Sequence, residues 1–180
     1  MRQNNKLTRR IAVFTLALIA PLAGATVISY STMLSGLAEE PANASPGSGI
    51  AMLTMDTTAH AMRVEASFTN LSGVVTAAHV HCCTPTPGAG NIGVATALPT
   101  FPGFPLGVTS GSYDQLFDLL LATSWNPSFV TAQGGLAGAE SALLAGLTGG
   151  GAYFNIHTAQ FPGGEIRGFL APTQVPEPST

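Results

Sequence analysis

The sequence predicts an all-β protein, an antiparallel β-sandwich or barrel with one short helix. Three observations predict it: short segments that alternate apolar and polar residues, Gly- and Pro-rich stretches between them, and a single Ala- and Leu-rich segment. The expected strands are residues 50–55, 60–68, 74–82, 92–97, 112–120, 152–159 and 165–171, and the expected helix is 137–147.

The alternation is clearest in residues 60–68, where the even positions hold His, Met, Val, Ala and Phe and the odd positions hold polar residues from Arg63 on. This period of two is typical of a half-buried strand. Residues 112–120 alternate similarly, and a helix stays open there as the alternative. Residues 84–105 are rich in Pro, which a central strand excludes, so we expect a long loop with one short strand at most. The helix at 137–147 is stopped by three consecutive glycines.

The composition excludes two classes of protein. Only 8% of the 180 residues are charged and 46% are hydrophobic, with a mean hydropathy of +0.34. Ordinary soluble domains carry charge on about a quarter of their residues. Disorder driven by charge is therefore excluded. Six Lys and Arg residues cannot form the basic surface that a nucleic-acid partner requires.

The positive charge is concentrated at the N-terminus. Four of the six cations precede residue 11, an apolar run follows at 11–23, and small residues occupy 23–25. This order predicts a secretory signal peptide over residues 1–25. The run is shorter than the ~20 residues of a membrane span, although an uncleaved anchor continuing through Ile28 is the alternative. Removal of the leader leaves two cations against nine acids, hence an acidic exported protein.

The rest of the chain divides into three parts by composition. Residues 26–48 end in a stretch rich in Pro, Ala, Ser and Gly and are interpreted as a linker. The predicted β domain spans 49–171, and 172–180 form a Pro-containing tail.

Four short motifs of the domain occur together in one known family. They are AHVH at 78–81, LLAG at 143–146, GAYFNIHT at 151–158 and FPGGEIRG at 161–168. In combination they resemble the CHRD domain, first described as a repeat in chordin, over residues 48–171. The resemblance implies an extracellular, mostly β module that binds protein ligands or belongs to an extracellular matrix.

The tail carries a second resemblance. Its VPEP sequence at 175–178 is similar to the opening of a PEP-CTERM sorting signal, so that 172–180 would be the start of a truncated signal. This implies export in a Gram-negative bacterium and processing by an exosortase-type enzyme. The expected location is the periplasm, the cell surface or an exopolysaccharide-rich extracellular matrix, with membrane contact only through the targeting segments.

Three histidines are candidate metal ligands. His79 and His81 lie two apart on a predicted strand, so both point to one face with Cβ atoms roughly 7 Å apart. His157 lies on another predicted strand and is a possible third ligand. Three His with an open position are typical of copper or zinc sites. The alternative is structural: these rings hydrogen-bond the backbone or Asn155.

The His-Val-His pair also resembles the copper-binding strand of copper/zinc superoxide dismutases, which are antiparallel sandwiches of Greek-key type. The sequence lacks their bridging-His loop and their zinc-ligand set. The resemblance therefore supports a superoxide-dismutase-like fold and leaves dismutase-like or redox chemistry as an alternative function.

The sequence also predicts an interaction for each of two further pairs of residues. Cys82 and Cys83 are the only cysteines, and we expect a disulfide between them; thiolate ligation of a metal beside His81, free thiols and bonding to a second chain are the alternatives. Glu165 and Arg167 lie two apart on a predicted strand, so a structural ion pair is expected, either between them or from Arg167 to an acid on the facing strand. No nucleophile–base pair stands out, so the sequence favours an exported binding or matrix module over an enzyme.

Overall fold

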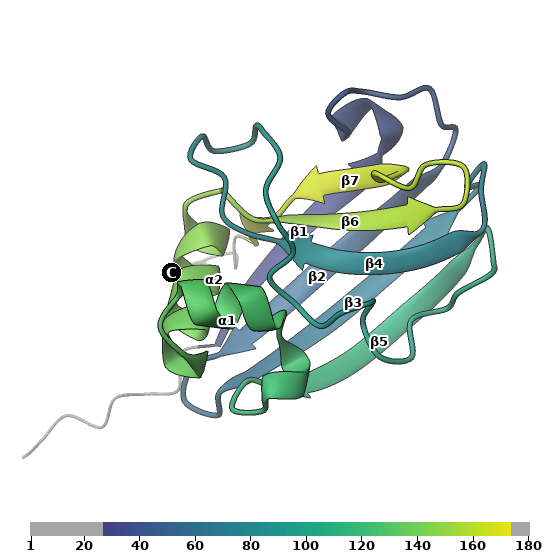
Figure 1. Ribbon diagram of the computed structural model, residues 1–180. Coiled ribbons are helices and arrows are strands. Elements are labelled where there is room, and N and C mark those ends of the chain that lie inside the picture. Colours follow the sequence, from purple (N-terminus) through teal and green to yellow (C-terminus); the bar gives the residue numbers. More distant parts are fainter. Residues whose placement is uncertain (1–26, 174–180) are drawn as a thin grey trace, which may run out of the picture.

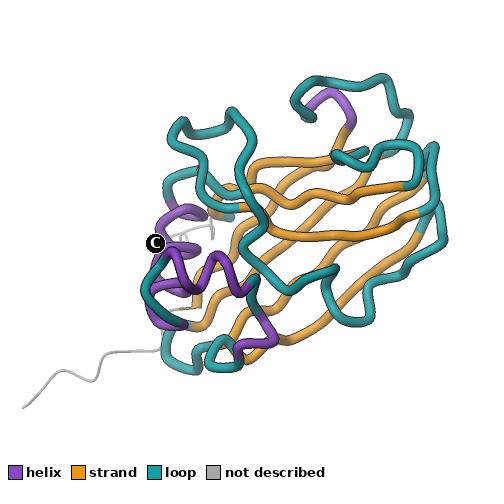
Figure 2. The backbone as a smooth tube through the Cα atoms, in the orientation of Figure 1, coloured by secondary structure: helices purple, strands orange, loops and turns teal. Residues whose placement is uncertain are grey.

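The computed structural model describes residues 27–173 and confirms the predicted fold class (Figures 1 and 2). The predicted signal peptide at 1–25 and the VPEP motif lie outside the described residues. The strands are β1 (Val27–Ser35), β2 (Ser48–Asp56), β3 (Ala61–Thr69), β4 (Val75–His81), β5 (Gly111–Asp118), β6 (Tyr153–Thr158), β7 (Ile166–Phe169) and β8 (Ala171–Pro172). The helices are η1 (Gly36–Ala38), η2 (Ala122–Ser124), α1 (Pro127–Ala132) and α2 (Leu136–Thr148).

All strands belong to one antiparallel sheet that curls into a half-barrel. The strand order is β4-β6-β7-β1-β2-β3-β5, and β8 pairs with β1. Figure 1 shows β4, β6 and β7 crossing in front of the longer strands, with α1 and α2 gathered at one end. The core fills the concave side, because alternate residues of each strand point inward. Its largest fully buried side chains include Trp125, Tyr30, Phe101, Phe154 and Leu53.

The alternation seen in the sequence sets which residues reach this core. In β3 the even positions 62, 64, 66 and 68 are buried, as the sequence predicts. Strand β5 pairs with β3 from Ala61↔Asp118 to Phe68↔Gly111, so the helical alternative for this segment is wrong. Helix α2 covers the predicted 137–147. Within the described residues, no helix is long and apolar enough to cross a membrane.

The interpretation of residues 26–48 as a linker is wrong for its first part. Residues 27–35 form β1, which lies inside the sheet and pairs with β2 from Val27↔Asp56 to Ser35↔Ser48. The error arises because only Tyr30 and Leu34 of β1 are buried, so its Ser and Thr residues resemble a linker in composition. One of these hydroxyls has a partner on the next strand, since Ser29 Oγ lies 3.0 Å from Thr54 Oγ1.

The structure differs from the sequence prediction in two other segments. The short strand at 92–97 is reduced to the isolated bridges His81↔Val94 and Thr96↔Trp125, within a loop that runs from the end of β4 to β5. Helix α1 was not predicted, because only six residues form it. It begins after Asn126, whose side chain accepts a hydrogen bond from the Ser128 N–H.

We expect Gly168→Ala to lower the free energy of unfolding by about 1–3 kcal/mol. A Cβ at position 168 would overlap the Met33 carbonyl oxygen and the Thr32 hydroxyl, because β7 passes directly against β1. Gly163→Ala is the control, since a Cβ there meets no atom within 4 Å. Chemical denaturation of both variants tests this, and equal stabilities would contradict the close packing of β7 on β1.

Candidate metal centre

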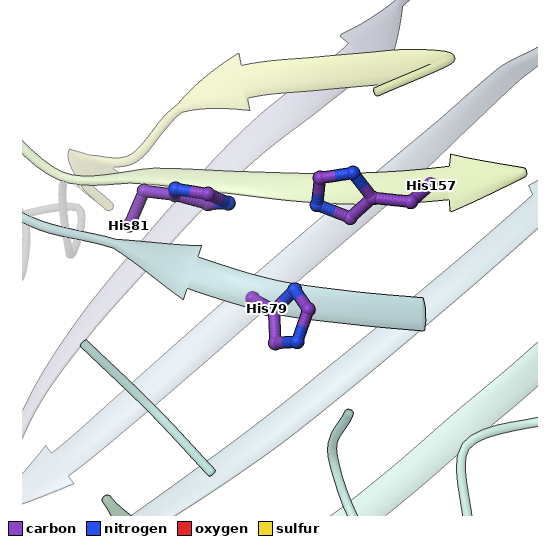
Figure 3. A group of neighbouring side chains, drawn as sticks. All are labelled: His79, His81 and His157. Carbon is purple, nitrogen blue, oxygen red and sulfur yellow. The ribbon is translucent and has the colours of Figure 1, made fainter. Parts of the chain in front are cut away.

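The structure brings His79, His81 and His157 together on the face of β4 and β6 that points away from the sheet's concave core (Figure 3). Strand β4 pairs with β6 in the register Ala77↔His157 and His79↔Asn155, so the three histidines lie on adjacent strands with the same orientation. One nitrogen from each ring lies within 4.8 Å of the other two. The ring centroids are 5.3–6.0 Å apart.

Each ring donates one N–H to a backbone carbonyl. His79 Nε2 lies 2.8 Å from the Pro99 oxygen, and His81 Nδ1 lies 2.7 Å from the Ile92 oxygen. His157 Nδ1 lies 3.0 Å from the Pro162 oxygen. A carbonyl oxygen only accepts, so these nitrogens carry the hydrogen. The remaining nitrogens, His79 Nδ1, His81 Nε2 and His157 Nε2, are buried and have no hydrogen-bond partner.

Burial keeps these rings neutral. It lowers the pKa of both His79 and His81 from 6.5 to about 4, although the carbonyl hydrogen bonds act in the opposite direction. Burial also lowers the pKa of His157. At neutral pH each ring therefore presents a free lone pair on its unpartnered nitrogen. A neutral imidazole whose other nitrogen donates to a carbonyl is the usual state of a metal-ligating histidine.

All the unpartnered, buried side-chain polar atoms found in the described residues lie on β4 and β6 or in the segment that follows η1. Besides the three nitrogens they are Asn155 Oδ1 and Glu39 Oε1. Asn155 lies between His79 and Arg167 in the register of β4, β6 and β7. A Cβ placed on Gly164 would meet both Asn155 and Glu39. Each unsatisfied buried group costs about 1–3 kcal/mol, a cost that ordered water, an ion or another ligand would offset.

Tyr153 positions His81 and was not singled out by the sequence. Its ring stacks on the His81 ring at 4.7 Å between centroids and 5° between planes. Its hydroxyl contacts Ile92, whose carbonyl accepts the His81 hydrogen bond. The Arg167 guanidinium lies 4.8 Å from the Tyr153 ring centroid. The signal was available in the sequence, because Tyr153 and His157 lie four apart and therefore on one face of their strand.

The sequence predicts that Arg167 pairs with Glu165 or with an acid on the facing strand. The pair with Glu165 is wrong, because each side chain has other partners, and the two acids that Arg167 meets follow η1 instead of lying on a strand. Arg167 is buried and lies 3.4 Å from Glu40 and 3.8 Å from Glu39. It also donates to the Ala38 carbonyl at 2.5 Å and to Asn91 Oδ1 at 2.6 Å. Glu165 precedes the first residue of β7, so the alternation of that strand does not place it beside Arg167.

Arg167 and Asn155 both affect Glu39. Burial raises the pKa of Glu39 from 4.5 to about 7, and the nearby Arg167 charge and the Asn155 hydrogen bond limit this rise. The carboxyl of Glu39 thus lies in a dry environment beside the histidine face. The charge that the Glu39 carboxyl would present to an ion bound by the histidines depends on whether this carboxyl is protonated.

Glu165 instead anchors a turn. Its carboxylate accepts hydrogen bonds from the hydroxyls of Ser45 (2.5 Å) and Thr158 (2.6 Å) and from the N–H groups of Ser72 (2.5 Å) and Gly73 (3.1 Å). Burial alone would raise the pKa of Glu165, but the four hydrogen bonds outweigh it and hold the pKa below its ordinary value.

The cysteines and the fourth described histidine lie apart from the cluster. Cys82 and Cys83 form a disulfide with each other, and Cys82 packs in the hydrophobic core. Within residues 27–173, the converging ligand atoms come from the three histidines and from neither cysteine. His60 Nδ1 lies 2.8 Å from Glu140 Oε2, with 45% of its side chain exposed.

We expect Glu165→Gln to lower the free energy of unfolding at pH 7 by about 2 kcal/mol, because an amide NH₂ replaces one acceptor of the buried network. Since the folded-state pKa of Glu165 is lowered, its stabilisation is complete above the ordinary value of 4.5 and is lost as the pH falls further. Denaturation at pH 7, 5, 4 and 3 should show the wild-type advantage shrinking below about pH 4.5. A constant difference would contradict the role of the carboxylate.

The comparisons with known proteins identify the family. A model of the CHRD domain matches residues 30–170, from within β1 to the residue after β7. No curated protein and no solved structure matches the chain. The match includes β1 from Tyr30 on, in agreement with the place of this strand inside the sheet. It covers all four motifs noted in the sequence and most of the chain, which therefore belongs to the CHRD domain family.

Proposed function

We propose that this CHRD domain binds a transition-metal ion through His79, His81 and His157. Two observations carry the proposal: each of the three rings offers a nitrogen within 4.8 Å of the other two, and each ring has one buried nitrogen without a partner. Each of these rings is already oriented by a carbonyl hydrogen bond on its other nitrogen. A purely structural role would leave three lone pairs buried and unused.

The donor set favours copper or zinc. Three neutral imidazoles suit Cu and Zn, whereas Mg²⁺ and Ca²⁺ prefer oxygen ligands. Three protein ligands leave at least one coordination position for water or another small ligand. Bound copper would supply redox chemistry and bound zinc would supply a Lewis acid. Dismutase-like chemistry remains the alternative to a binding role without catalysis.

The setting we propose for this site is outside the cytoplasm. Support comes from the family, from the basic and apolar segment at 1–25 and from the VPEP motif of the tail. In this proposal the domain is exported by a Gram-negative bacterium, processed by an exosortase-type enzyme and retained at the surface or in the matrix. Exopolysaccharide or an extracellular protein would be its partner there.

We expect the purified metal-free protein to bind one Cu²⁺ or Zn²⁺ ion per chain. Each substitution removes a direct ligand. We therefore expect the metal affinity to fall by more than the roughly 10–100-fold that is typical when only a hydrogen-bond partner of a ligand is lost. Isothermal titration of His79→Ala, His81→Ala and His157→Ala, with elemental analysis after dialysis, measures this.

The control for these variants is His60→Ala, which removes a histidine outside the cluster. Its metal affinity should equal that of the wild type. Equal metal binding by the wild type and the His79→Ala/His81→Ala double variant would contradict the proposed site.

The proposed location has its own test. We expect expression of the full chain in a Gram-negative host to give a periplasmic or extracellular product that lacks the first ~25 residues, as a cleaved leader requires. A matched chain without residues 2–25 should remain in the cytoplasm. Mass spectrometry of the fractionated cells decides, and an intact N-terminus on the exported product would contradict cleavage.

A further inference from the structure

The disulfide between Cys82 and Cys83 lies beside a cavity that the metal centre does not use. Both cysteines line a cavity of about 730 Å³, together with residues of α1, α2 and the loop that follows β4. None of the lining residues is charged, and Cys83 is only half-buried. Both cysteines thus border an uncharged cavity, which is the side from which a small thiol would approach the disulfide.

Helix α2 packs directly on the two sulfur atoms. A Cβ on Gly146 would overlap the Sγ atoms of both Cys82 and Cys83, so the absence of a side chain there allows the contact. Two sulfurs that are no longer bonded must separate to van der Waals distance. Because α2 blocks one side, their separation requires a shift of α2 or a movement of the cysteines into the cavity.

A movement of Cys82 would be transmitted to His81 of the proposed metal centre through residues 92–93. Cys82 follows His81, and the Cys82 N–H donates to the Gly93 carbonyl at 3.3 Å. The adjacent Ile92 carbonyl accepts the hydrogen bond of His81 Nδ1 at 2.7 Å. Residues 92–93 are thus hydrogen-bonded both to Cys82 and to the His81 ring. A displacement of Cys82 would therefore change the orientation of the His81 ring.

We propose that Cys82–Cys83 is a redox-active disulfide that exchanges with small dithiols, and that its reduction weakens metal binding through His81. The second part rests on the proposed function. In the exchange, a thiolate of the dithiol attacks one sulfur and the Cys82–Cys83 bond breaks, giving a mixed disulfide. The second thiol of the dithiol then resolves it. The dithiol is oxidised to its own disulfide, and the two cysteines gain two electrons and two protons.

Thiol titration of the native protein tests the exchange. After incubation with dithiothreitol and its removal under anaerobic conditions, we expect two reactive thiols per chain without denaturant, and none before the treatment. Incubation with oxidised dithiothreitol is the handling control. Thiols that are released only in denaturant would overturn the proposal that the disulfide exchanges in the folded protein.

Titration with Co²⁺ tests the coupling, because its visible spectrum reports thiolate ligation. We expect the reduced protein to bind Co²⁺ about 10–100-fold more weakly than the oxidised protein, with no thiolate-to-cobalt charge-transfer band. A Cys82→Ser/Cys83→Ser variant should match the reduced protein and should not respond to dithiol. Equal affinities, or tighter binding with a thiolate band, would overturn the coupling.

Failure of the metal proposal can be distinguished from failure of this one. If the oxidised protein binds neither Co²⁺ nor Cu²⁺ nor Zn²⁺, the proposed function fails, while the thiol titration still decides the exchange. The NMR resonances of the His81 ring then report the coupling in the metal-free protein. They should shift on reduction, and unchanged resonances would overturn it.

Discussion

The antiparallel pairing of β4 with β6 is the constraint on which both the core and the candidate centre depend. In this register Val80 and Phe154 point into the apolar core, while His79 and Asn155 point to the opposite face. A shift of one strand by one residue would exchange its two faces, which would place imidazoles in the apolar core and core side chains on the polar outer face. The apolar residues that fix the register for packing thereby also fix which nitrogens meet.

The outer face of β4, β6 and β7 is buried although it is polar, and this burial accounts for its electrostatics. Helix η1 and two loops contribute backbone acceptors to it, the carbonyls of Ala38, Ile92 and Pro162. Exclusion of water lowers the pKa of the histidines and raises that of Glu39. Arg167 is the one cation in this part of the described structure, and it is held by backbone and side-chain acceptors rather than by a single carboxylate.

The sequence predicts the parts of this molecule that follow from local periodicity. Strand β3 and helix α2 fall where alternation and Ala–Leu composition indicate them, and the spacing of His79 and His81 predicts that they share a face. It does not predict β1, because a strand with two buried side chains carries too little apolar pattern. Nor does it predict the partners of Arg167, since these come from loops whose paths depend on tertiary packing.

The origin of the carbonyl acceptors has an evolutionary consequence. The strands supply the three imidazoles, but the oxygens of Pro99, Ile92 and Pro162 select which nitrogen of each ring is left free. Every residue type has a backbone carbonyl, so most substitutions in these loops conserve the tautomers as long as the loop path is kept. Insertions and deletions change that path. Across a lineage, the centre would therefore tolerate drift in loop sequence and would be limited by loop length.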